Sequence, residues 1–176
     1  MTGKERISLE KDDRAAALVA FMVDQIGRIF PTRSVGRSLL QKLFYILSRD
    51  DNVDAFFELF INGPYSDWVE SALNQAAESG MLTTVKENGR SIISARGGIA
   101  GHVMPNLKEK VNRCVHAYGF YGEEDLAILT TVIFLEDHGS FGPDELIKAV
   151  GTMNPRFDMR RVLSLVDHTD VVYRSW

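Results

Sequence analysis

The chain has little cysteine: Cys114 is its single example among 176 residues. An intramolecular disulfide framework is therefore excluded, and one cysteine with four histidines shows no metal-ligand spacing. A long apolar run is also lacking, since the longest one lies within residues 127–135 and is too short to span a bilayer. Residues 1–14 are charged and lack the apolar core of a secretory signal, so we do not expect one there. We therefore expect a cytoplasmic protein without metal, cofactor or membrane contact.

An excess of positive charge is lacking too. The 20 Lys and Arg residues face 24 Asp and Glu residues, which gives a formal charge of −4. This balance excludes a strongly basic nucleic-acid coat protein but leaves room for a local basic patch. Apolar residues make up 45% of the chain, enough to bury a core in one ordinary domain or two small ones.

The N-terminal half shows helical periodicity interrupted by short extended segments. Residues 1–14 are polar, which predicts a flexible tail. Apolar residues then recur three or four positions apart in three segments, each of which predicts an amphipathic helix. The first helix is expected over residues 15–30. The second is expected to begin between residues 32 and 37 and to end at residue 47, and the third is expected from Ser66 to about residue 79.

Two extended segments accompany these helices. Alternating residues predict a strand over 54–61, with Phe57 on one face and Phe60 on the other, and Gly63-Pro64 predicts a tight turn after it. Residues 82–86 and 90–95 flank Asn88-Gly89, which predicts a hairpin with a type I′ turn. Three helices followed by a two-stranded ribbon is the order of a winged helix-turn-helix.

The C-terminal half has a helical pattern throughout. The glycine-rich segment 97–101 predicts a flexible break, so we expect a winged-helix-like domain over 15–97 and a linker over 98–105. A helical bundle follows over 106–176, either separate or sharing one core with the first domain. Its helices are predicted near residues 107–118, 123–138, 143–150 and 155–166, the last two opened by Pro143 and Pro155. The expected fold is thus mainly α, with a small β-hairpin.

Two short motifs carry a resemblance to known proteins. Gln41-Lys42-Leu43 lies in the second predicted helix, and Gly63-Pro64-Tyr65-Ser66 joins the predicted strand to the third. Over about residues 15–97 the chain resembles the YwgA-like family of small prokaryotic proteins and, more distantly, the SocA-like (Panacea) antitoxin domain. Both are similar in having an LQKLxY helix and a strand that leads into a GPxS turn. The resemblance implies a winged-helix-like domain without established catalysis, acting in regulation, antitoxin action or protein–protein adaptation.

Charges on the third predicted helix argue against its insertion into DNA. Asp67, Glu70 and Glu78 are acidic, and the helix has no basic residue, so the phosphate backbone would repel it. Basic residues gather instead in the second helix, the turn before it and the ribbon. They form a solvated surface, a nucleic-acid patch or a site for an acidic protein partner, and the candidates are Arg33, Arg37, Lys42, Lys86 and Arg90.

Aromatic residues follow the glycine-proline motif. Tyr65 and Trp68 either form an exposed anchor for a partner protein or fasten the start of the third helix to the core.

Catalytic residues are not evident. Cys114 and His116 are two positions apart in a predicted helix, so they face different directions and cannot pair as nucleophile and base. We therefore predict a non-enzymatic, antitoxin-like regulatory or adaptor protein that binds another protein. The alternative is a DNA-binding winged-helix transcriptional regulator, and a homodimer is compatible with either.

Overall fold

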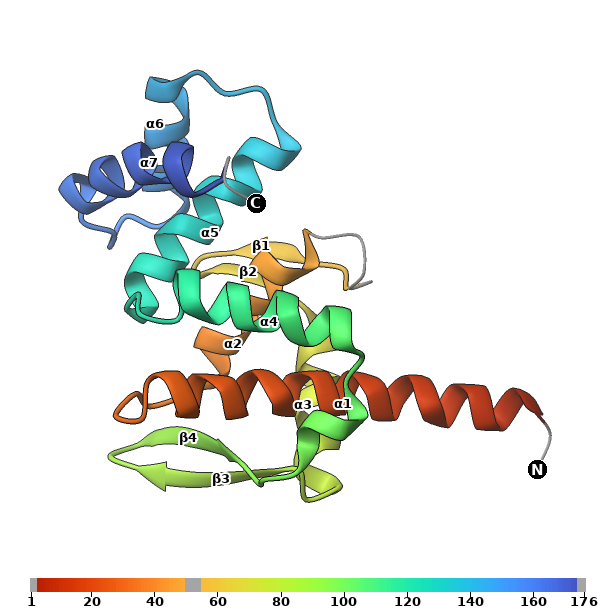
Figure 1. The fold of residues 1–176 in the computed structure, drawn as a ribbon. Coiled ribbons are helices and arrows are strands. Elements are labelled where there is room, and N and C mark those ends of the chain that lie inside the picture. The colour runs from red at the N-terminus through yellow and green to blue at the C-terminus, as the bar shows by residue number, and fades with distance from the viewer. Residues whose placement is uncertain (1–2, 50–54, 174–176) are drawn as a thin grey trace. The chain divides into compact units, whose positions relative to one another are not determined.

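A computed structural model describes residues 3–49 and 55–173, which are mainly helical, as the sequence predicts (Figure 1). These residues form seven α-helices, one short 3₁₀ helix and two antiparallel sheets of two strands each. The helices are α1 (Gly3–Ile29), α2 (Arg37–Ser48), α3 (Asp67–Glu78), α4 (Pro105–Tyr118), α5 (Glu123–His138), α6 (Pro143–Met153) and α7 (Met159–Tyr173). The strands are β1 (Glu58–Phe60), β2 (Gly63–Tyr65), β3 (Leu82–Glu87) and β4 (Arg90–Ala95), and the 3₁₀ helix is η1 (Ile99–His102).

Contacts divide these elements into two compact units. Unit 1 comprises the described residues of 1–56 and 66–120, and unit 2 comprises those of 57–65 and 121–176. The chain therefore enters unit 2 twice, first for the β1–β2 hairpin and again from Tyr121 onward.

Helix α1 is the centre of unit 1. Its residues 16–23 are all buried, because α3, α4, β4 and η1 pack around it. Figure 1 shows the β3–β4 ribbon on one side of α1 and α4 on the other. The helix begins at Gly3, so residues 3–14, which the sequence predicts to be a flexible tail, are helical.

The segment between α1 and α2 is extended and reaches the ribbon. The Ile93 N–H donates to the Val35 carbonyl over 2.8 Å, so Val35 lies beside β4. Helix α2 begins only at Arg37. Arg33 lies before the helix and therefore does not share a helix face with Arg37.

The ribbon itself confirms its prediction. Glu87 pairs with Arg90, and the intervening Asn88 and Gly89 have φ angles of 50° and 76°, as a type I′ turn requires.

The predicted linker over 98–105 lies inside unit 1. Ile99 in η1 and Val103 after it are buried, and η1 packs on α1. Helix α4, predicted to belong to the C-terminal bundle, packs on α1 and α2 instead. The glycines allow a turn here, with Gly98 at a φ of 92°, while the two apolar side chains fix the segment to the core.

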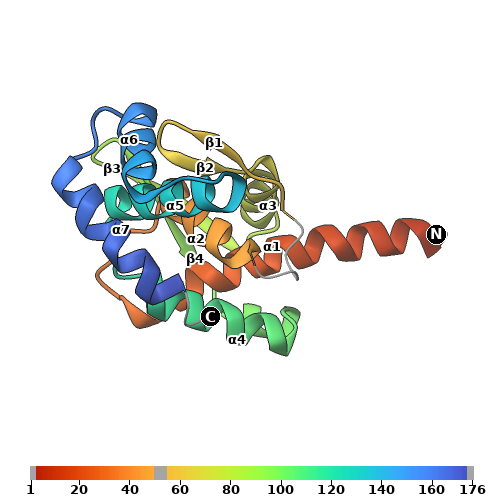
Figure 2. The same ribbon diagram turned by 90° about the horizontal axis from the view of Figure 1, so that it is seen from above.

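Unit 2 is built on α5, with α6 and α7 packed against it (Figure 2). Residues 126–133 of α5 are all buried, because α6, α7 and β2 cover different sides of the helix. Helix α7 begins at Met159, not at Pro155 as predicted. Asp158 provides the reason, since its Oδ1 accepts the Arg160 N–H over 2.9 Å and so caps the helix.

The hairpin of unit 2 also corrects its prediction. Phe60 pairs with Gly63, so the turn consists of Ile61 and Asn62, and Gly63-Pro64 lies within β2. Phe57 is buried and Phe60 is exposed, as the predicted alternation requires. The same alternation places Ile61 on the face of Phe57, but Ile61 is exposed because β1 ends at Phe60 and Ile61 lies in the turn.

Candidate functional site

Gln41 of the first motif contacts Ser66, the last residue of the second motif, within unit 1, whereas residues 63–65 of the second motif belong to unit 2. The Gln41 side chain donates through Nε2 to the Ser66 carbonyl over 3.1 Å and accepts the Ser66 N–H through Oε1 over 2.9 Å. Both residues are buried, so this pair of hydrogen bonds fixes the start of α3 to α2 without competition from water. Ser66 occupies the N-cap position as predicted, but its hydroxyl makes no capping bond. The motifs thus have a structural role.

Trp68, a predicted partner anchor, faces the core of unit 1. It is half-buried, and its ring centroid lies 6.2 Å from that of the buried Phe44 at a tilt of 59°. This packing corresponds to the alternative use considered for it, the fastening of α3 to the core.

Arg37, at the first position of α2, also connects α2 to α3. Its guanidinium pairs with the Glu70 carboxylate and donates to Asn74 Oδ1 over 3.0 Å. Its charge is therefore compensated within unit 1, and it contributes less to a basic patch than its sequence position suggests.

Lys42 does not belong to a surface patch. It is only 4% exposed, because α2 is buried on most sides. Arg33 is half-buried in the segment before α2, so only Lys86 and Arg90 on the ribbon are exposed among the five basic candidates.

Tyr65, the other predicted anchor, belongs to an aromatic cluster on the hairpin of unit 2. Its ring lies edge-on to that of Phe60, with centroids 5.7 Å apart and an interplanar angle of 79°. Tyr65 is half-buried, whereas Phe60 is 51% exposed and Ile61 is 55% exposed. We call Phe60 and Ile61 the hairpin tip. Sequence reasoning did not choose these two residues as a site, although the alternation of the strand placed Phe60 opposite the buried Phe57.

Asn154 holds the hairpin tip in place from the turn between α6 and α7. Its Nδ2 donates to the Ile61 carbonyl over 2.9 Å, and its Oδ1 accepts the Arg156 N–H over 3.0 Å. Asn154 is only 3% exposed, so its buried carboxamide connects the turn between α6 and α7 to Ile61, which lies 93 residues before Asn154 in sequence. Nothing in the local pattern around Asn154 predicts this contact.

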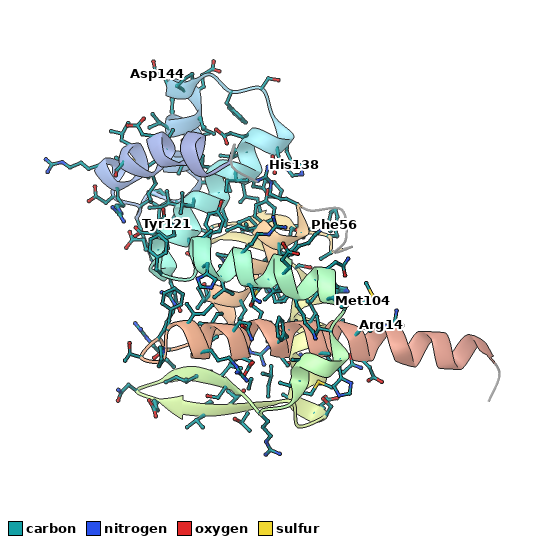
Figure 3. All side chains as sticks on the ribbon, viewed as in Figure 1. Arg14, Phe56, Met104, Tyr121, His138 and Asp144 are labelled. Carbon is teal, nitrogen blue, oxygen red and sulfur yellow. The ribbon has the colours of Figure 1, made fainter. Side chains whose placement is uncertain are left out.

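A shallow groove of about 550 Å³ lies elsewhere in unit 2, between the end of α5 and α6. Figure 3 labels His138 and Asp144, which mark the end of α5 and the start of α6. Apolar side chains and a few polar ones line the groove, and of the polar ones Glu145 accepts the Gly142 N–H over 3.1 Å. The lining residues are Leu135, Ser140, Phe141, Glu145, Lys148, Ala149, Thr152 and Met153.

The described part of the chain contains no group of three or more His, Cys, Asp or Glu residues able to hold a metal ion. Cys114 is buried, and its thiol donates to the Leu43 carbonyl over 3.5 Å, while His116 is exposed. Burial raises the pKa of the Cys114 thiol to about 12, so it is held in its protonated form. None of the helices in the described ranges is long and apolar enough to cross a membrane.

Comparisons with known proteins gave no match to this chain, either among protein-family models or among curated proteins. The resemblance to the YwgA-like family therefore stays a prediction.

Proposed function

We propose that this protein is a non-enzymatic regulatory or adaptor protein that binds another protein through the hairpin tip. The observation that carries the proposal is the exposure of Phe60 and Ile61, adjacent large apolar side chains that are each more than half accessible to solvent. Adjacent exposed apolar side chains are a feature of interaction sites, where aromatic anchors supply much of the binding energy.

The anchoring of the hairpin tip supports the same function. Tyr65 packs against the Phe60 ring from β2, and the buried Asn154 holds the Ile61 carbonyl. A surface that is ordered before binding loses less conformational entropy when a partner docks. The fixed hairpin tip is therefore suited to recognition.

Unit 1 serves in this proposal as a winged-helix-like scaffold. The order α1, α2, α3 and ribbon supports it, as does the hydrogen bond that places Val35 beside β4, where a winged helix has a short strand between its first two helices. An antitoxin-like role is what the resemblance to the SocA-like domain implies. On α3, Asp67 and Glu78 are exposed without a basic neighbour on the same helix, which favours a protein partner over DNA.

The proposal predicts that polar substitutions at the hairpin tip abolish partner binding without unfolding the protein. We expect Phe60→Ser combined with Ile61→Ser to reduce the partner recovered from native cells by at least about tenfold, since the loss of one buried anchor typically costs 2 kcal/mol or more. Quantitative mass spectrometry of the co-purified proteins measures this loss. Val85→Ser is the matched control, because Val85 is 56% exposed on the ribbon of unit 1. Equal recovery with both variants would contradict the proposal.

DNA binding is the second candidate function, and the exposed Lys86 and Arg90 on the ribbon favour it. Because Arg37 is paired and Lys42 is buried, few phosphate contacts remain available to the predicted patch. We therefore expect fluorescence anisotropy with mixed-sequence duplex DNA to show weak binding even at low salt. Tight binding that falls steeply with salt, and that Lys86→Ala with Arg90→Ala removes, would establish the DNA-binding function instead.

A further inference from the structure

An arginine lies beside the hairpin tip. Asn154 bonds to the backbone of both Ile61 and Arg156, so the side chains of these two residues leave the backbone at neighbouring positions in unit 2. Both are exposed. The exposed residues at this place in unit 2 therefore include the apolar Phe60 and Ile61 and the basic Arg156.

The charge of Arg156 is not compensated within the described residues. Asp158, the nearest acid in sequence, uses its Oδ1 to cap α7 at Arg160. A neighbouring arginine shows the contrast: Arg161 forms a bidentate pair with Asp125, with its Nε 2.7 Å from Oδ1. Arg156 has no such ion pair in the described part of the chain, so its guanidinium is available to an acceptor from outside.

We propose that the segment that docks on the hairpin tip is an acidic peptide segment of a partner protein. Its apolar side chain covers Phe60 and Ile61, and a carboxylate beside that side chain accepts hydrogen bonds from Arg156. This inference rests on the proposed function and adds the chemistry of the partner to it.

Charge and apolar character together favour an acidic peptide over a nucleic acid. A carboxylate matches the fork of an arginine in bidentate geometry, and apolar cover next to it excludes water and strengthens the pair. A nucleic acid binds mainly through many phosphates and would need several cations, whereas Phe60, Ile61 and Arg156 together supply one guanidinium. A peptide with a few acids and an apolar anchor supplies both the carboxylate that pairs with Arg156 and the apolar side chain that covers Phe60 and Ile61.

The test uses the full-length protein with a photo-crosslinking amino acid in place of Ile61, expressed in native cells. After irradiation, mass spectrometry identifies the captured protein and the segment joined to position 61. We expect a partner segment that contains Asp or Glu within a few residues of an apolar side chain. A charge reversal, Arg156→Glu, should lower the crosslinking yield by at least about tenfold, while Arg156→Lys retains most of it.

Controls separate a change at the site from a change in the fold. Arg96→Glu reverses an exposed arginine in unit 1 and should leave the yield unchanged. Circular dichroism and thermal unfolding verify that each variant is folded.

The outcomes distinguish the two proposals. If folded protein gives no more capture at position 61 than with the crosslinker at Val85, the hairpin tip binds nothing and the proposed function falls. If a partner is captured equally with Arg156→Glu, or through a neutral or basic segment, protein binding stands and the acidic-segment inference is overturned. Capture of a second copy of this chain or of nucleic acid overturns the inference as well.

Discussion

Replacing Gln41 by leucine is expected to lower the free energy of unfolding by about 1–3 kcal/mol. Leucine matches the size of glutamine but neither donates nor accepts, so the Ser66 N–H would lose its partner in a buried environment, while the Ser66 carbonyl would keep the hydrogen bond from the Glu70 N–H. Each unsatisfied buried backbone group costs about 1–3 kcal/mol. Equilibrium unfolding in urea measures the change from the shift of the transition midpoint.

Gln75→Leu is the matched control, since Gln75 lies half-buried on α3 and the same substitution there breaks no such pair. We expect a change within about 0.5 kcal/mol for this variant. Similar stability of the Gln41→Leu and Gln75→Leu proteins would show that the Gln41–Ser66 pair is not a main determinant of α3 placement. If the Gln41→Leu protein is less stable than the Gln75→Leu protein, as expected, Gln41 is a determinant of the fold. The motif that contains Gln41 is then explained by structure and is weaker evidence about function.

Local patterns predicted the elements well because local physics determines them. Pro31 ends α1, since proline has no N–H to donate and clashes with the preceding turn. Asn88 and Gly89 tolerate positive φ angles and so form the ribbon turn. Pro143 lies at the first position of α6, where a missing N–H costs nothing.

Contacts between distant segments could not be predicted in this way. Lys42 is a basic residue in a helix, yet it is buried, because α2 is covered on most of its sides. Arg37 was a candidate for a basic patch until Glu70, 33 residues away, proved to be its partner. Asn154 follows the end of α6, and its bond to Ile61 depends on packing that no local window contains.

The predicted partner anchors illustrate the same limit. Tyr65 and Trp68 are three residues apart, but they belong to different units and pack on different aromatic rings. The sequence showed that the segment was rich in aromatic residues, while the pairing of Phe60 with Gly63 determined which ring is exposed. The residues that we propose as a binding site, Phe60 and Ile61, therefore differ from the anchors predicted from the sequence, Tyr65 and Trp68, which lie a few residues later in the chain.

Cys114 is expected to react with a thiol reagent thousands of times more slowly in the native protein than in the unfolded protein. The residue is fully buried between α4 and α2, and its thiol donates to the Leu43 carbonyl, so reaction requires opening of the α2–α4 contact. If that opening costs about 5 kcal/mol, the reactive fraction is about 10⁻⁴ to 10⁻³. The rate of absorbance change with an aromatic disulfide reagent at pH 8, with and without denaturant, measures this protection.

The same burial makes stability depend on pH. The pKa of the Cys114 thiol rises from 9.0 to about 12 in the folded protein, so between these values the unfolded state loses the proton first and unfolding becomes more favourable as pH increases. Relative to Cys114→Ala, the wild-type protein should lose up to about 1.4 kcal/mol of stability per pH unit above pH 9.

Thr84→Cys in the Cys114→Ala background is the control for the reactivity measurement, since it provides an exposed thiol that should react at the unfolded rate. Rapid native reaction of Cys114, or parallel stability curves for the wild-type and Cys114→Ala proteins, would mean that α4 opens readily from α2 and that unit 1 is less firmly packed than its buried thiol indicates.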